Sequence, residues 1–332
     1  MKHASSLLLC AGSTLLVLIG AELALRALDL PKAYRIPRPD DEYARALTHE
    51  KSSIPGLAYE LRRTGDLPGS TNPLGIRDTV DILDKPRGTR RIVCLGDSFT
   101  YGLGVGVTEC YAKRLEHHLG GVPRGWQVLN LGVGGYCSRD EACVFLHKIP
   151  LFDPDLVIVG YALNDPDTEN TGGLHNFFRH HPASHRLHLF RLGKGALRRI
   201  GKWRWGGYIP YMHRDEHYWG SVREAFRVMG DCAARRELPV LLVIFPVPPR
   251  GDRDCWQSYP YEWVHEQVRD EGLKNAFDVI DLLPVFRAHS GDSLRLSAAD
   301  AHPSPYAHDL AGERIARTVL ERFDGEPGRV RE

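Results

Sequence analysis

The residues of this chain that can do chemistry stand where apolar runs end. The run 91–95 leads directly into Gly96-Asp97-Ser98, and Gly102 follows closely. This pattern predicts a buried strand that delivers a serine onto a tight turn at its carboxyl end. Ligands bind at that edge of open α/β sheets. A serine there can act as a nucleophile if a base takes its proton and N–H groups hold the resulting oxyanion.

Three later blocks supply groups of the required kinds. The strand-like run 128–131 breaks into a glycine-rich turn that contains Gly135. The run 156–163 ends in Asn164-Asp165, and Asp300 and His302 lie near the C-terminus. A backbone N–H at a glycine, a carboxamide N–H and an imidazole are the donors and the base that a nucleophilic serine needs.

Ser98, Gly135, Asn164 and His302, in this order, resemble the SGNH (GDSL-type) hydrolase superfamily over about residues 88–322. The resemblance implies that Ser98 is the nucleophile and His302 the general base. It implies that the N–H groups of Ser98 and Gly135 and the side chain of Asn164 bind the oxyanion, and that no cofactor is needed. The implied fold is α/β, a three-layer α/β/α sandwich of the flavodoxin-like kind with about five parallel strands.

The carboxylate that orients the base departs from the family pattern. The family usually has an aspartate three residues before the histidine, where this chain has Ala299. We predict Asp300, two residues before His302, as the orienting acid. The alternative is a backbone carbonyl in that role, which would leave a Ser98–His302 dyad.

Each of these residues also has a purely structural interpretation. Ser98 or Asp97 can cap a helix, and the glycines can simply form a turn. Asn164 can form an Asx-turn ahead of Pro166, and His302 is one of 16 histidines. Four such residues in the family's order favour the catalytic interpretation, whereas Asp97 is predicted to be structural.

The composition fits one globular enzyme-sized domain. The 332 residues are 42% hydrophobic and 26% charged, which excludes disordered and fibrous classes. The formal net charge of +1 gives no strong field for nucleic acid, so no nucleic-acid partner is expected.

The N-terminal segment is apolar from Ala4 to Ala21, which is just long enough for a membrane span. We predict a signal anchor or signal peptide over residues 1–26, with an uncleaved anchor preferred. The protein would then be bound to the membrane through this helix, with its catalytic domain in the periplasm or outside the cell. The alternatives are a secreted protein, after cleavage, and a buried helix of a soluble protein.

The remaining chain divides into a lead-in segment over 27–87 and a hydrolase domain over 88–325. The lead-in contains the stretch 71–78, Thr-Asn-Pro-Leu-Gly-Ile-Arg-Asp. It resembles a short element often found just upstream of the nucleophile strand in bacterial exported members of the family, and we expect it to pack on the domain. Alternating patterns within the domain predict strands at 91–95, 126–131, 155–160, 239–245 and 277–281, and helices at 108–120, 139–149, 217–237, 260–273 and 305–323.

An insertion over 166–216 interrupts this alternation. It is rich in aromatic, basic and histidine residues and follows the Asn164 block, so it can roof the site. Its histidines lack the spacing of a metal site, and no metal is expected. The alternative is a surface helix pair whose aromatics pack on the core.

The seven cysteines leave disulfides open. Cys137 with Cys143, and Cys232 with Cys255, are the two possible pairs in an exported domain. Sequence alone does not decide between paired and free thiols.

The expected activity is hydrolysis of an ester, and the substrate a small molecule or a glycan. A short acyl group on a cell-envelope glycan is the leading expectation, resting on export and on the resemblance. The alternatives are an O-acyltransferase that uses the same residues and a non-catalytic glycan-binding domain. The sequence leaves the acyl chain length, the acceptor and the oligomeric state open.

Overall fold

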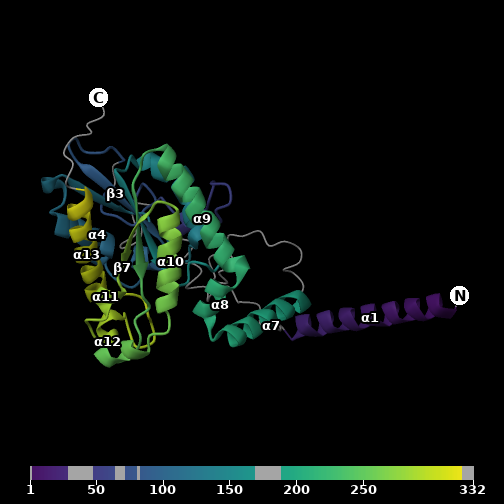
Figure 1. The fold of residues 1–332 in the computed structure, drawn as a ribbon. Coiled ribbons are helices and arrows are strands. Elements are labelled where there is room, and N and C mark those ends of the chain that lie inside the picture. Colours follow the sequence, from purple (N-terminus) through teal and green to yellow (C-terminus); the bar gives the residue numbers. More distant parts are fainter. Residues whose placement is uncertain (1, 29–47, 64–71, 81–82, 169–187, 324–332) are drawn as a thin grey trace.

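The computed structural model describes residues 2–28, 48–63, 72–80, 83–168 and 188–323 (Figure 1). Parts of the predicted segments therefore lie outside the described residues. They are residue 1, most of the lead-in segment (29–47, 64–71 and 81–82), residues 169–187 of the insertion, and residues 324–325 of the hydrolase domain.

The centre of the fold is a five-stranded sheet with the order β4-β3-β5-β6-β7, in which all neighbours run parallel. The strands are β3 (Arg90–Gly96), β4 (Trp126–Asn130), β5 (Leu156–Ala162), β6 (Val240–Phe245) and β7 (Asp278–Asp281). The register pairs Gly96 with Gly160 at the carboxyl ends of the two central strands. Because the strands are parallel, the segments that follow them meet at one edge.

Helices cover both faces of this sheet (Figure 1). The longer helices of the domain are α4 (Tyr111–Leu119), α5 (Ser138–His147), α9 (Glu216–Arg235), α10 (Glu262–Lys274) and α13 (Pro305–Phe323), and the short ones are α3 (Ser98–Tyr101), α11 (Leu283–Phe286) and α12 (Gly291–Leu294). Helices α4 and α13 pack together on one face, and α5 packs with α9 on the other.

Alternation along the strands divides the core into two buried clusters. Val93 and Leu95 of β3 belong to the cluster under α5 and α9, whereas Ile92 and Cys94 belong to the cluster under α4 and α13. Successive side chains of a strand point to opposite faces, so a strand that is apolar throughout must be covered on both sides. The predicted three-layer α/β/α sandwich with a five-stranded parallel sheet is therefore confirmed.

The predicted elements differ from the observed ones mainly at their ends. The five strands match within about two residues at each end. The helix expected at 108–120 is divided into a 3-10 turn at Val107–Glu109 and α4, which begins only at Tyr111. Cys110 between them has an extended backbone, with φ −66° and ψ 152°, and this conformation stops a single continuous helix.

The described parts of the lead-in segment pack on the domain, as expected for the stretch that includes Ile76. It forms a small antiparallel hairpin from β1 (His49–Lys51) and β2 (Tyr59–Leu61). Tyr59, Leu61 and Ile76 are each only 1% exposed and join the cluster under α5 and α9. The lead-in segment thus contributes side chains to the hydrophobic core.

Helix α1 (Lys2–Ala27) projects away from the domain (Figure 1). Its window Cys10–Ala27 has a mean hydropathy of 1.5 and is 0% buried, so it is long and apolar enough to cross a membrane. Near its C-terminal end, the carboxylate of Glu22 accepts the backbone N–H groups of His188 and Leu189 at 3.0 and 2.9 Å. These two residues begin α7 (His188–Trp205), which leads into α8 (Tyr208–Arg214).

All seven cysteines lie among the described residues, and each is a free thiol. Neither possible disulfide pair is therefore formed. Cys137 immediately precedes α5 and Cys143 lies within that helix, which separates the first pair along a rigid element.

Candidate active site

Ser98 is placed at the carboxyl edge of the sheet by the turn between β3 and α3. Asp97 caps this helix, since its Oδ1 accepts the N–H of Phe99 at 2.8 Å, so the capping role belongs to Asp97 and not to Ser98. A Cβ on Gly96 would lie 2.1 Å from Thr100 Oγ1 and 2.7 Å from the carbonyl oxygen of Gly160. Only glycine therefore allows so close a turn after the strand.

His302 and Asp300 lie in the loop between α12 and α13. His302 Nε2 is 2.9 Å from Ser98 Oγ, and His302 Nδ1 is 2.6 Å from Asp300 Oδ1. The same carboxylate oxygen accepts the backbone N–H of His302 at 3.0 Å. The loop thus folds Asp300 back onto the imidazole, which brings the two side chains together although only one residue separates them.

The protonation of this group follows from its partners. A carboxylate only accepts hydrogen bonds, so Nδ1 of His302 carries the proton and Nε2 is free to accept from Ser98. Burial raises the pKa of Asp300, but the hydrogen bonds from the backbone and ring of His302 outweigh it, and the net pKa lies below the usual value. Asp300 is therefore ionised where a neutral imidazole can act as a base.

Asn164 follows β5 and turns its side chain toward Asp97. Its Nδ2 lies 3.1 Å from Asp97 Oδ2, and Ser98 Oγ lies 3.2 Å from the same oxygen. The side chain of Asn164 thus bonds across the sheet edge, and the structural Asx-turn interpretation does not hold for it. The neighbouring Asp165 makes the local bond instead, accepting the N–H of Ala162 at 2.9 Å.

The glycine-rich turn follows β4 beside the serine. A Cβ on Gly134 would lie 4.0 Å from Ser98 Cβ, which places this turn directly against the nucleophile candidate. Gly135 has a φ of 84°, a left-handed conformation that favours glycine. The hydroxyl of Tyr59 donates to the carbonyl of Gly134 at 2.9 Å, so the lead-in hairpin supports the turn from below.

Three carboxyl groups are fully buried beneath the site. Asp97, Glu141 and Asp165 each have 0% exposure. Burial raises the pKa of all three, and repulsion from nearby carboxyl groups, Asp97 among them, raises the pKa of Glu141 and Asp165 further. Among the described residues, neither carboxyl oxygen of Glu141 has a hydrogen-bond partner. The physical consequence is that Glu141 and Asp165 retain protons at pH values where ordinary carboxyl groups are ionised.

Four of the five predicted site residues line one cleft of about 250 Å³, namely Ser98, Asn164, Asp300 and His302. Gly135 is not among its lining residues. The remaining wall is formed by Phe99, Tyr208, Ile209, Val247 and Ala301. The α8 part of the insertion therefore borders the site, as the roof interpretation expects.

Sequence reasoning did not single out Ile209 and Val247. Val247 lies just beyond the carboxyl end of β6. Because ligands bind at that edge of the sheet, its position after a predicted strand could have identified it as a site residue. Ile209 reaches the cleft only because α8 folds back onto the sheet. Nothing in its local pattern indicates this.

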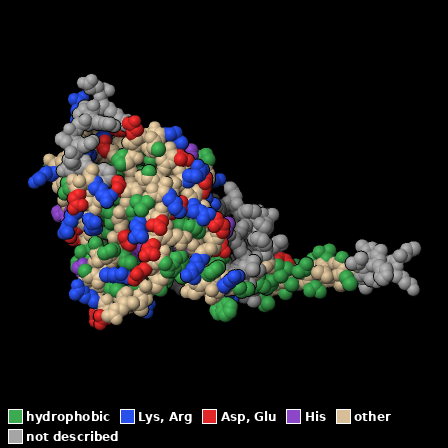
Figure 2. All heavy atoms as spheres, viewed as in Figure 1, with side chains coloured by type: hydrophobic (Ala, Val, Ile, Leu, Met, Phe, Trp, Pro, Cys, Tyr) green, Lys and Arg blue, Asp and Glu red, His purple; other side chains and the backbone are tan. Residues whose placement is uncertain are grey.

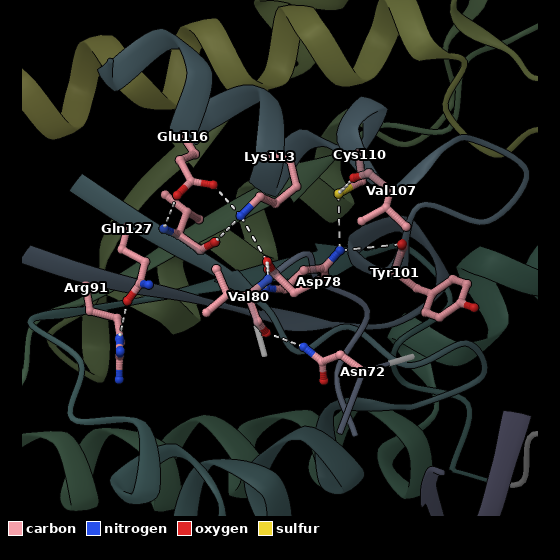
Figure 3. Close-up of polar contacts among 12 residues, drawn as sticks. Asn72, Asp78, Val80, Arg91, Tyr101, Val107, Cys110, Lys113, Glu116 and Gln127 are labelled. Atoms are coloured by element: carbon pink, nitrogen blue, oxygen red, sulfur yellow. Dashed lines mark hydrogen bonds and ion pairs between the residues drawn. The ribbon is translucent and has the colours of Figure 1, made fainter. Parts of the chain in front are cut away.

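Residues 72–78 of the lead-in hold the segment around α3 in place. Arg77 is buried and donates from Nη1 to the carbonyl of Tyr101 at 2.6 Å and from Nη2 to the carbonyl of Val105 at 2.5 Å. Asp78 forms an ion pair with Lys113 at 3.0 Å (Figure 3). The lead-in thereby satisfies carbonyls directly after α3, the helix that begins with Ser98.

The described residues contain no group of three or more His, Cys, Asp or Glu side chains that could hold a metal ion. The polar side chains that line the cleft carry hydroxyl, imidazole, carboxylate and amide groups.

The family model of the GDSL-like lipase/acylhydrolase family matches residues 94–310. This range contains the strand-to-serine turn, the glycine turn, Asn164 and the Asp300–His302 loop. The chain belongs to this family, and it is a hydrolase that acts on ester bonds.

Solved structures with a similar fold include a lipase/acylhydrolase from Enterococcus faecalis, at 19% identity and a TM-score of 0.44 over 70% of this chain and 97% of that one. A member of the lipolytic G-D-S-L family from Veillonella parvula gives 14% and 0.39 over 72% and 100%. An acetyl-xylooligosaccharide esterase from Geobacillus gives 17% and 0.44 over 74% and 99%. A comparison with curated proteins gave no match.

Proposed function

We propose that the protein is a serine esterase in which Ser98 is the nucleophile, His302 the general base and Asp300 the group that orients it. The observation that carries this proposal is the hydrogen-bonded series Ser98 Oγ–His302 Nε2 at 2.9 Å and His302 Nδ1–Asp300 Oδ1 at 2.6 Å. Nucleophile, base and orienting acid stand within the distances that proton transfer requires.

The reaction proceeds in two stages. Ser98 Oγ attacks the ester carbonyl carbon while its proton passes to His302 Nε2, and collapse of the tetrahedral intermediate expels the alcohol, which takes the proton back. Water then attacks the acyl-enzyme, giving its proton to His302, and Ser98 is released with the free acid. Asp300 stabilises the imidazolium that forms in each stage.

The oxyanion is held by N–H groups at the edge of the sheet. The backbone N–H of Ser98, the backbone N–H of Gly135 and the carboxamide of Asn164 are the proposed donors. Asn164 lines the same cleft as Ser98, which supports its part directly. For Gly135, support comes from the family resemblance and from its turn against Ser98. One such donor is worth about 10²–10³ in kcat in other serine hydrolases.

The substrate proposed is an ester with a short acyl group, carried by a cell-envelope glycan or a related carbohydrate. The cleft of about 250 Å³ is smaller than the 300–1,000 Å³ usual for drug-sized ligands, which favours a small acyl group. His302 and Asp300 are 26% and 39% exposed, so water can reach the base. This exposure favours hydrolysis over acyl transfer to a second bound hydroxyl.

We also propose that α1 anchors the protein in a membrane, with the catalytic domain outside the cytoplasm. In the view of Figure 2, hydrophobic side chains cover the described part of the helix, whereas many Lys, Arg, Asp and Glu side chains lie on the visible face of the domain. Burying such a helix in lipid removes its apolar surface from water, and the described part of the domain leaves the window Cys10–Ala27 unburied.

The test of the esterase proposal is Ser98→Ala assayed on p-nitrophenyl acetate. Loss of a serine nucleophile costs on the order of 10⁶ in kcat elsewhere, so activity should fall to background while the unfolding transition is retained. The matched control is Ser290→Ala, a serine outside the cleft at the start of α12, which should keep wild-type activity. A folded Ser98→Ala protein with wild-type activity would contradict the proposal.

A further inference from the structure

Asp97 lies beneath the proposed catalytic residues, and the mechanism above gives it no part. Three donor atoms lie within hydrogen-bond distance of its fully buried carboxylate. Oδ1 accepts the N–H of Phe99 at 2.8 Å, and Oδ2 accepts from Ser98 Oγ at 3.2 Å and from Asn164 Nδ2 at 3.1 Å. The first of these bonds caps α3. The other two reach into the site itself.

The contacts of Asp97 with Ser98 and with Asn164 differ in whether their hydrogen has a second acceptor. The hydroxyl of Ser98 has one hydrogen, and its nearer acceptor is His302 Nε2, at 2.9 Å. Ser98 therefore donates this hydrogen to His302 Nε2, and its contact with Asp97 is at most a weak, secondary hydrogen bond. The contact between Asp97 and Asn164 involves a hydrogen that no other acceptor shares in the described residues. It is present before, during and after proton transfer.

This contact decides which end of the carboxamide faces the cleft. The NH₂ group and the oxygen of Asn164 are close in size, so packing alone discriminates poorly between them. A carboxylate only accepts, and it therefore requires the NH₂ group on its own side. One N–H bonds Asp97, and the second is left to point toward the oxyanion. With the opposite orientation, the carboxamide oxygen would repel both the carboxylate and the oxyanion.

The negative charge of the buried carboxyl cluster is best placed on Asp97. It accepts hydrogen bonds from the N–H of Phe99 and from Asn164 Nδ2, Asp165 accepts one from a backbone N–H, and Glu141 has no hydrogen-bond partner among the described residues. Hydrogen bonds to the charged form favour ionisation, and like charges nearby oppose it. Glu141 and Asp165 are then neutral, and Asp97 acts as the acceptor that the geometry requires.

We propose that Asp97 is a positioning residue that orients the carboxamide of Asn164 so that its N–H faces the oxyanion. The inference rests on the proposed function, because it gives Asn164 a part in binding the oxyanion. Asp97 acts through Asn164 and does not touch the substrate. Its effect should therefore disappear when Asn164 is removed.

The test is a double-mutant cycle of Asp97→Asn and Asn164→Ala on p-nitrophenyl acetate. Asparagine also caps helices, so Asp97→Asn keeps the cap of α3 but no longer forces the orientation of the carboxamide. We expect it to lower kcat by about tenfold or more with little change in KM, because the lost interaction belongs to the transition state. In the Asn164→Ala background, the same substitution should lower kcat by less than about twofold.

Asp215→Asn is the matched control. Asp215 caps α9 in the same manner, accepting the N–H of His217 at 3.0 Å, and it does not line the cleft. This variant should keep wild-type kcat.

Three results would overturn the inference. One is equal losses from Asp97→Asn in the two backgrounds, which indicate a role independent of Asn164. Another is full activity of Asp97→Asn in a protein where Asn164→Ala is impaired. The third is failure of both Asp97→Asn and Asp97→Ser to fold, since Asp97 would then serve the fold first. If Asn164→Ala itself leaves kcat unchanged, the oxyanion part of the proposed function fails instead.

Discussion

At the scale of single residues, the position of the acid is the feature that sets this chain apart. Asp300 precedes His302 by two residues, and the loop bends so that its carboxylate receives both the ring and the backbone N–H of His302. The sequence identified the residue but left a backbone carbonyl as an alternative. The bend depends on bonds within the loop, such as the N–H of Leu296 to the carbonyl of His302, which no spacing rule predicts.

Asp300→Asn should lower kcat by roughly 10⁴, as loss of the triad acid does elsewhere. Because the hydrogen bonds from His302 hold the pKa of Asp300 below its usual value, the carboxylate is charged throughout the neutral and mildly acidic range. The loss should therefore be similar at each pH in that range, measured with p-nitrophenyl acetate. Asp309→Asn, a surface carboxylate beside Arg114, is the control. Wild-type kcat in Asp300→Asn would show that Asp300 does not orient the base.

Glu141 gives a second prediction, on stability. Its pKa is raised by burial first, and then by repulsion from Asp97 and Asp140. The native state therefore keeps a proton that the unfolded chain loses above about pH 4.3, and stability falls as pH rises from there to the raised native pKa. This dependence amounts to at most about 1.4 kcal/mol in the free energy of unfolding per pH unit. Glu141→Gln should remove it, which urea unfolding measured from pH 5 to 8 would show. An unchanged pH dependence in the variant would mean that Glu141 is ionised in the native state.

At the scale of elements, the site depends on the five strands, which local sequence patterns predict well, and on the stretch 71–78, which they do not predict. Continuous apolar runs gave the five strands, because a strand covered on both faces must be apolar throughout. The stretch 71–78 has no such period, yet Arg77 reaches the carbonyls that follow α3, more than twenty residues away in sequence. Contacts of this kind become visible only when the chain is folded. The expectation that the segment packs on the domain came from resemblance.

Arg77→Ala tests this part of the structure. It would leave the carbonyl of Val105 without its donor, and it would remove one of two donors from the carbonyls of Tyr101 and Gly102, which keep Asn130 Nδ2 at 3.5 Å and the N–H of Val105 at 3.2 Å. An orphaned buried group costs about 1–3 kcal/mol, so we expect a loss of about 1–3 kcal/mol in the free energy of unfolding by urea. Arg227→Ala, in an exposed ion pair on α9, should change it by less than about 1 kcal/mol. Equal, small losses in both variants would show that the segment does not support α3.

At the scale of the whole molecule, the fold and the set Ser98, Asn164, Asp300 and His302 were accessible from sequence, because each residue follows a strand or a loop at one sheet edge. The residues that shape the cleft were not. Ile209 belongs to α8, inside the insertion, and its place beside Ser98 in the cleft depends on how α8 packs. The link from α1 to α7 through Glu22 is likewise a long-range contact without a local signal.

The anchor gives a prediction at this scale. Full-length protein should sediment with membranes and resist carbonate extraction, because α1 exposes an apolar surface long enough to span a bilayer. A chain that begins at Lys32 should be recovered in the soluble fraction with its esterase activity. A mature N-terminus near Glu22 or Ala27 in secreted material would replace the anchor by a cleaved signal.

The most direct test of the central claim is labelling of the full-length protein with a fluorophosphonate, followed by mass spectrometry of the modified peptide. An activated serine attacks phosphorus as it attacks an ester carbonyl, and the adduct stays on Oγ. We predict a single label on Ser98, lost in Ser98→Ala and strongly slowed in His302→Ala. Labelling of a different serine, or none in protein that hydrolyses esters, would contradict it.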